Sequence, residues 1–284
     1  PIDVDTVFRI ASMSKSFTAL AVLKLRDAGR LELDAPVARY VPELADLAPP
    51  TADSGPVTVR DLLRHTGGFP EDNPWGDRQM AITDVELGTW LEAGIPFSTG
   101  TGSTYEYSNY GFALLGRIVE NVAGEPFPAW VRRELLAPLA MDATVYEPAG
   151  VPPGRLARGY RFEDGVALPE TPLPDGAFGP MGGLLTSSRD LARWVAFLLD
   201  AFPPRDDPER GPALRRSVRE LQRGSNDARV TLRRDDPNAP PEAVASSYAF
   251  GLRQYDSCTL GRHVSHGGGF PGFGSTMVSL PERR

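Results

Sequence analysis

The sequence predicts an α+β fold, in which an antiparallel sheet is flanked by helices and accompanied by a mainly helical region. Apolar residues recur at helical spacing near the start of the chain and through most of residues 35–200. Alternating and β-branched residues instead gather at about residues 248–281, which predicts strands there. Because a sheet of so few strands would have an open edge, we expect the sheet to be incomplete within residues 1–284.

The first predicted helix covers residues 12–28. The apolar residues Met13, Phe17, Leu20 and Leu25 recur at helical spacing. Gly29 can adopt the left-handed conformation that ends a helix. A helix with such an apolar stripe belongs at the centre of the molecule.

Capping signals predict the helices that follow. Thr58 and Thr83 each precede an acidic residue by three positions, and Gly124 ends a helix that starts at Tyr110. The other predicted elements are helices at 129–136, 187–199 and 213–222 and strands at 248–255, 263–266 and 274–280. Residues 201–247 are rich in Pro, Asp and Arg, which predicts a long surface excursion with one short helix.

Composition excludes several classes of function. The formal net charge of −7 disfavours a duplex nucleic-acid partner, because phosphate contacts need a basic face. No apolar run approaches the roughly 20 residues that span a bilayer, and the single cysteine, Cys258, can form neither an intrachain disulfide nor a thiolate metal site. The sequence assigns no compartment. Because it starts at Pro1 and not at Met, we expect that the true amino terminus has been processed, clipped or left out.

Ser12-Met13-Ser14-Lys15 is the first candidate for chemistry. Positions three apart share a helix face, so the hydroxyl of Ser12 and the amine of Lys15 can touch. A serine becomes a nucleophile when a desolvated neutral lysine takes its proton. Only two of the 30 basic residues are lysines, Lys15 and Lys24, so a retained lysine indicates a place where a permanent guanidinium charge does not serve. The alternative is a helix-capping serine and a solvated lysine.

Tyr107-Ser108-Asn109 stands directly before a predicted helix. A phenol acts in acid–base chemistry when a nearby cation stabilises its anion, and a lysine would provide one. The alternative is a hydrophobic loop anchor with Asn109 as a helix cap.

His266-Gly267-Gly268-Gly269 ends a predicted strand. Glycines let a backbone approach a ligand and present N–H groups to an oxyanion. A phosphate-binding loop would need a following helix, and a lipase would need Gly-x-Ser-x-Gly, which is absent. The remaining alternative is a plain hairpin corner. With three histidines in all, His263 and His266 lack an obvious third zinc ligand, so we expect no metal and no cofactor.

The three motifs in this order resemble the serine β-lactamase and penicillin-recognising family, in its class C β-lactamase, DD-peptidase and esterase branch. Further similarity lies in Leu62 to Phe69, in residues 107–124 and 138–144, and in Gly182 to Thr186. The resemblance covers most of Val7 to Pro281. It implies one β-lactamase-like serine hydrolase domain over residues 1–284, with its terminal elements missing from this chain.

The resemblance also implies residue roles. Ser12 would be the acylated nucleophile, and Lys15 and Tyr107 the pair that moves protons. Asn109 would position the substrate and Lys15, and His266 would face the substrate's carboxylate or polar tail. Gly268 would belong to the same strand motif, and the N–H groups of Ser12 and Gly269 would bind the oxyanion.

The implied activity is hydrolysis of an ester or amide, namely a β-lactam, a D-amino-acid peptide or a carboxylester, with a small molecule or peptide as substrate. His266 replaces the family's usual lysine, which makes a β-lactamase less favoured because histidine is mostly neutral at pH 7. One alternative is a catalytically silent protein that binds peptidoglycan-type ligands or a protein partner. Another is a Ser-His-Asp hydrolase that pairs Ser12 or Ser103 with His266.

Overall fold

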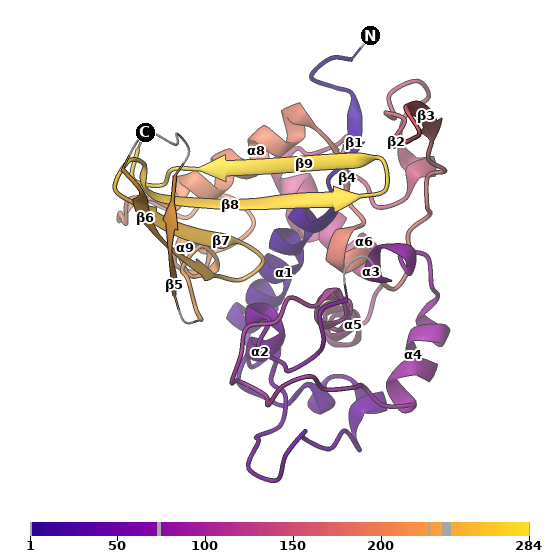
Figure 1. Ribbon diagram of the computed structural model, residues 1–284, viewed down its shortest axis with the longest axis vertical. Coiled ribbons are helices and arrows are strands. Elements are labelled where there is room, and N and C mark those ends of the chain that lie inside the picture. The colour runs from indigo at the N-terminus through magenta and orange to yellow at the C-terminus, as the bar shows by residue number, and fades with distance from the viewer. Residues whose placement is uncertain (1, 73–74, 227, 235–239, 284) are drawn as a thin grey trace.

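The computed structural model describes residues 2–72, 75–226, 228–234 and 240–283. A five-stranded antiparallel sheet has the strand order β5-β6-β7-β8-β9, so every strand pairs with its neighbour in sequence. Its strands are β5 (Arg229–Arg233), β6 (Glu242–Tyr248), β7 (Arg253–Ser257), β8 (Gly261–Phe270) and β9 (Phe273–Ser279). In Figure 1 the long β8–β9 hairpin crosses the molecule above the helical region. The α+β class is therefore confirmed.

Helices dominate the rest of the chain. They are α1 (Lys15–Asp27), α2 (Val59–Arg64), α3 (Trp75–Arg78), α4 (Asp84–Glu92), α5 (Asn109–Ala123), α6 (Phe127–Val131), α7 (Gly179–Gly182), α8 (Ser188–Asp200) and α9 (Arg215–Leu221). A short sheet pairs β1 (Val7–Arg9) with β4 (Leu185–Ser187), and a hairpin pairs β2 (Tyr160–Glu163) with β3 (Val166–Pro169). Among the described residues, no helix has the length and apolarity needed to cross a bilayer.

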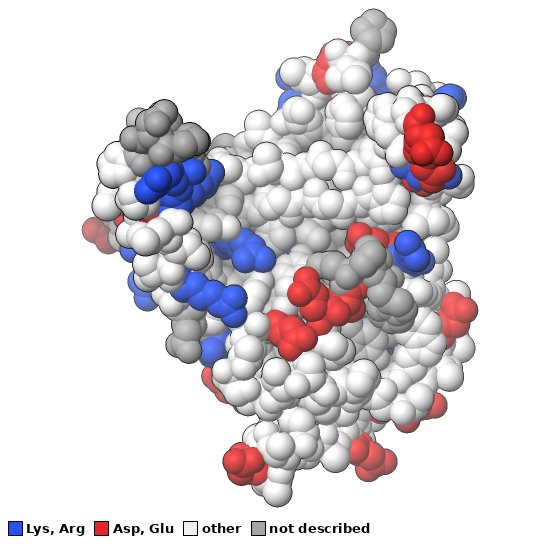
Figure 2. All heavy atoms as spheres, in the orientation of Figure 1, with Lys and Arg blue, Asp and Glu red and all other residues white. Residues whose placement is uncertain are grey.

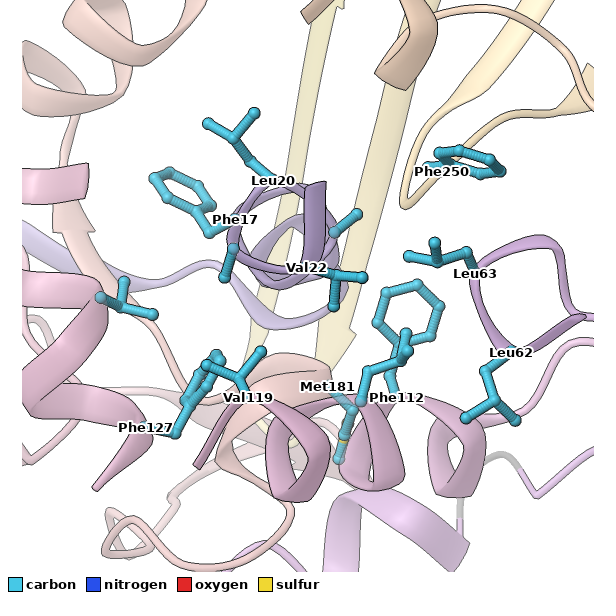
Figure 3. Close-up of a cluster of buried hydrophobic side chains, with 14 of the residues drawn as sticks. Phe17, Leu20, Val22, Leu62, Leu63, Phe112, Val119, Phe127, Met181 and Phe250 are labelled. Atoms are coloured by element: carbon cyan, nitrogen blue, oxygen red, sulfur yellow. The ribbon is translucent and has the colours of Figure 1, made fainter. Parts of the chain in front are cut away.

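Helix α1 lies in the centre of the hydrophobic core. Figure 3 shows Phe17, Leu20 and Val22 pointing from it in different directions toward side chains of several other segments. Phe112 of α5 and Phe250 are among those neighbours, and all five side chains are at most 2% exposed. Burial on all sides fixes the position of α1 and therefore of the residues at its N-terminus.

The predicted capping residues lie at the ends of helices α2, α4 and α5. Thr58 accepts a hydrogen bond from the backbone N–H of Asp61 while the Asp61 carboxylate accepts one from the N–H of Thr58, and Thr83 and Glu86 repeat this capping box. Gly124 ends α5 in the left-handed conformation, with φ of 77°.

Three predictions about elements are wrong. The stretch 201–247 contains strand β5 and most of strand β6 as well as a helix, although residues 227 and 235–239 lie outside the described part. The strand predicted at 248–255 is two strands, because β6 ends at Tyr248 and β7 begins at Arg253. Strand β5 was not identified from the sequence, because every residue in it is exposed and no buried face produced a pattern that could identify it. The helix predicted from residue 12 begins as a 3-10 turn, η1 (Ala11–Ser14).

Candidate active site

Ser12 lies in the tight turn η1, directly before α1. The backbone on either side is anchored, because the N–H of Ile10 donates to the carbonyl of Leu184 over 3.0 Å and Ser14 Oγ accepts from the N–H of Leu184 over 3.1 Å. Ala11 adopts a left-handed conformation with φ of 48°, which is strained for a residue with a Cβ. The fold therefore holds this serine in a constrained backbone turn, as is common at functional sites.

Lys15 begins α1 one turn after Ser12 and is completely buried. Its Nζ donates to Asn109 Oδ1 and to the backbone carbonyl of Met181, each over 2.7 Å, and lies 3.2 Å from Ser12 Oγ. Burial lowers the pKa of Lys15 to about 7, against the opposing attraction of the Asp72 and Asp77 carboxylates. A large fraction of this amine is thus neutral at physiological pH.

The loop before α5 brings Tyr107 and Asn109 to the same place. Ser108 caps α5 by accepting the N–H of Gly111 over 3.2 Å, so Asn109 is not the cap, and its side chain contacts Lys15. Asp72 fixes the helix start by accepting the N–H groups of Asn109 and Tyr110 over 2.8 and 2.7 Å.

Tyr107 completes a cluster around the serine. Burial raises the pKa of its phenol above the usual range, while a hydrogen bond with Ser12 opposes this shift. The Nζ of Lys15 lies 4.8 Å from the centre of the Tyr107 ring. The phenol is therefore protonated at neutral pH and can donate a proton, whereas a neutral Lys15 can accept one.

His266 lies on β8, where it is 4% exposed. Its Nε2 is 3.1 Å from the hydroxyl of Tyr248, and its Nδ1 contacts the carbonyl of Gly267. Burial, together with the positive charges of Lys15 and Arg253, lowers the pKa of His266 to about 3. The imidazole is neutral, so it supplies no cation for a substrate carboxylate.

The triglycine segment lies within β8 and not at its end, which corrects the predicted strand boundary. Gly268 packs so closely on the backbone before the η1 turn that a Cβ there would stand 2.1 Å from the carbonyl oxygen of Ile10. Ser275 Oγ, on the paired strand, donates to the same oxygen over 2.8 Å. At Gly269, by contrast, a Cβ would meet nothing within 4 Å. Close packing at Gly268 therefore aligns β8 beside Ser12.

A cleft of about 580 Å³ opens over this cluster. Its lining combines residues of the η1 turn, the tyrosine loop, the sheet and the loop that contains Glu71: Ser12, Glu71, Tyr105, Glu106, Tyr107, Arg229, Arg253, His266 and Gly267. The structure thus brings together Ser12, Lys15, Tyr107, Asn109 and His266, all identified from the sequence.

The sequence did not identify the Met181 carbonyl, Asp72, Tyr248 or Arg253 as parts of the site. A backbone acceptor has no residue signature, and the other three lie far along the chain from any motif. The only sequence signal for Arg253 was its place on a strand beside that of His266.

The described residues form neither the alternative serine–histidine site nor a metal site. Ser103 Oγ bonds to the carbonyl of Gly100 on the surface, and the Nε2 of His266 faces a tyrosine and not a serine. His65, between the rings of Tyr105 and Tyr107, accepts the N–H of Ser108 over 3.1 Å and so supports the tyrosine loop. Within the described residues, no group of three or more His, Cys, Asp or Glu side chains could hold a metal ion.

Comparison with known proteins identifies the family of the chain. The family model described as Beta-lactamase matches residues 1–284. The chain belongs to the beta-lactamase family. Relatives of the chain include Protein flp of Staphylococcus aureus, 32% identical over 206 residues, which are 70% of this chain and 39% of that protein. The D-alanyl-D-alanine-carboxypeptidase/endopeptidase AmpH of Escherichia coli is 30% identical over 195 residues, 68% of this chain and 49% of that protein. The chain thus spans less than half the length of these relatives.

Solved structures share the beta-lactamase-family fold. The octameric penicillin-binding protein homologue from Pyrococcus abyssi matches 99% of this chain and 61% of that chain, with a TM-score of 0.77 and 24% identity. The class C beta lactamase from Rhodobacter sphaeroides matches 99% of this chain and 78% of that chain, with a TM-score of 0.71 and 23% identity.

Proposed function

We propose that this chain is a serine hydrolase domain that cleaves an ester or amide through an acyl-enzyme on Ser12. The proposed substrate classes are a β-lactam, a D-amino-acid peptide and a carboxylester. Family membership supports hydrolysis in general, and the similarity to the D-alanyl-D-alanine-carboxypeptidase/endopeptidase AmpH favours a peptide substrate. One buried cluster joins the helical region to the sheet, which supports a single domain over residues 1–284.

The observation on which the proposal rests is the set of partners around Lys15 Nζ. A neutral primary amine has two N–H donors and one lone pair. The Asn109 amide oxygen and the Met181 carbonyl can only accept, so they take the two donors. The lone pair is then left for the hydroxyl of Ser12, which can donate. The geometry therefore favours transfer of the serine proton to Lys15.

Acylation follows from these contacts. The Ser12 hydroxyl gives its proton to Lys15 while Oγ forms a bond to the substrate's carbonyl carbon. The backbone N–H groups of Ser12 and Gly269 are proposed to hydrogen-bond the resulting oxyanion. When the intermediate collapses, the bond from carbon to the leaving nitrogen or oxygen breaks. Tyr107 protonates the leaving group, and the Lys15 ammonium returns a proton to Tyr107.

Deacylation reverses these roles. Water attacks the ester carbon as the Lys15 and Tyr107 pair accepts its proton, and the bond to Ser12 Oγ breaks. The acid is released, and the proton returns to Ser12. No cofactor is needed in this sequence of steps.

Mass spectrometry of the intact protein tests the proposal. After treatment with a fluorophosphonate or a penicillin, we expect one adduct, located on Ser12 by peptide mapping and absent from Ser12→Ala. Ser103→Ala is the matched control and should label normally, because this hydroxyl bonds to a surface loop. A folded protein that forms no adduct with either reagent would favour a silent, ligand-binding member of the family.

A further inference from the structure

The two walls of the cleft carry opposite charges. Arg253 on β7 and Arg229 on β5 line the side formed by the sheet, and Glu71 and Glu106 line the side formed by the helical region. Figure 2 shows basic side chains gathered on the sheet side of this face and acidic side chains across the hollow from them.

None of these four groups forms an ion pair with another described residue, although many arginines elsewhere do. Their hydrogen-bond partners are neutral. Arg253 donates to the hydroxyl of Tyr105 over 3.0 Å, and Glu106 accepts from Ser98 Oγ over 2.6 Å and from the N–H of Glu71 over 3.0 Å. Charged groups in a concave site therefore remain available to a ligand of opposite charge.

Arg253 is held in place before any ligand arrives. Its guanidinium carbon lies 5.7 Å from the centre of the Tyr105 ring and 5.5 Å from that of Tyr248, within cation–π range. A partly buried cation with no counter-ion gains more from a carboxylate than an exposed one would. Glu106 is likewise oriented by its two donors.

We propose that the cleft selects a dipolar substrate, with a carboxylate bound by Arg253 and an ammonium group bound by Glu71 and Glu106, on opposite sides of the carbonyl attacked by Ser12. This inference rests on the proposed acyl-enzyme function and adds the charge pattern of its substrate. Because His266 is neutral, Arg253 takes the place of the cation that the usual motif lysine would provide.

A two-by-two substrate set tests the proposal. The probes are ω-aminoacyl-D-alanines with acyl chains of two, four and six carbons, each with the amine free or acetylated and the carboxylate free or amidated. Release of the D-alanine part is followed by mass spectrometry. For the best chain length, we expect blocking either charge to lower kcat/KM about 10- to 100-fold, as for a lost charge-assisted hydrogen bond, and blocking both to lower it further.

Substitutions on each side of the cleft test which residues cause each charge preference. Arg253→Met should remove the preference for the free carboxylate and keep that for the free amine. The double variant Glu71→Gln, Glu106→Gln should do the reverse. Arg262→Met, on β8 but paired with Asp256, and Glu92→Gln, on α4, are matched controls outside the cleft and should keep both preferences.

The outcomes separate this inference from the proposed function. Labelling of Ser12 together with equal turnover of all four probe types would overturn the dipolar substrate and leave the acyl-enzyme intact. Preferences that persist in Arg253→Met and in the double glutamate variant would also overturn it. Absence of Ser12 labelling would contradict the proposed function itself.

Discussion

The two ends of helix α1 hold the only two lysines of the chain in opposite environments. Lys24, near the C-terminal end, is 26% exposed in its side chain and pairs with the carboxylate of Glu134 over 2.6 Å. Lys15, at the N-terminal end, is fully buried among a hydroxyl, an amide oxygen and a backbone carbonyl. The same residue type is thus an ion-pairing cation at one end and a group that can lose its proton at the other.

Burial without an adjacent counter-ion accounts for the difference. An ammonium in such a place loses its hydration and gains no full negative charge in direct contact, so its neutral form is favoured. The nearby carboxylates of Asp72 and Asp77 moderate the effect but do not cancel it, since the pKa of Lys15 stays at about 7.

Exchange of each lysine for arginine produces the largest expected contrast. Lys15→Arg should slow Ser12 acylation by about 10²- to 10⁴-fold, because a guanidinium cannot act as the base at neutral pH. Lys24→Arg should keep the ion pair with Glu134 and leave the rate within about twofold. The measurement is the rate constant for adduct formation by intact mass. Equal rates in the two variants would show that the ends of α1 do not differ as described.

A pair of glycines tests whether close packing holds the N-terminal end of α1, beside Ser12, in place. Gly268→Ala should destabilise the protein by about 1–3 kcal/mol and slow acylation, because its Cβ would clash with the Ile10 carbonyl before Ser12. Gly269→Ala keeps its backbone N–H and has open space around the new Cβ, so stability should change by at most about 0.5 kcal/mol. Urea denaturation measures both. A similar loss in the two variants would contradict the packing argument.

The next contrast concerns how stability depends on pH. The folded-state pKa of Lys15 is about 7 and its ordinary value is 10.5, so between these values the unfolded chain binds a proton that the folded protein does not. The free energy of unfolding should therefore rise with pH above about 7, by up to about 1.4 kcal/mol per pH unit, relative to Lys15→Met. Lys24→Met serves as the control. Parallel curves for wild type and Lys15→Met would contradict the lowered pKa.

The sequence predicted those parts of the site that depend on short spacing. Ser12 and Lys15 are three positions apart where a helix begins, and the Tyr107 loop stands next to a capped helix, so local rules were enough. The strand containing His266 was found, but β5 and the break between Tyr248 and Arg253 were not, because these short segments show no continuous buried face. The carbonyl of Met181 and the charges of Glu71 and Arg253 reach the site through tertiary packing, which no local pattern reports.

The pH dependence of Ser12 acylation tests the central claim most directly. The rate of fluorophosphonate adduct formation would be measured from pH 5 to pH 9, with the adduct located by peptide mapping. A neutral Lys15 acting as base predicts a rate that rises about tenfold per pH unit in acid, bends near pH 7 and is constant above it. A rate that does not change between pH 5 and pH 9, or an adduct on a residue other than Ser12, would contradict the account.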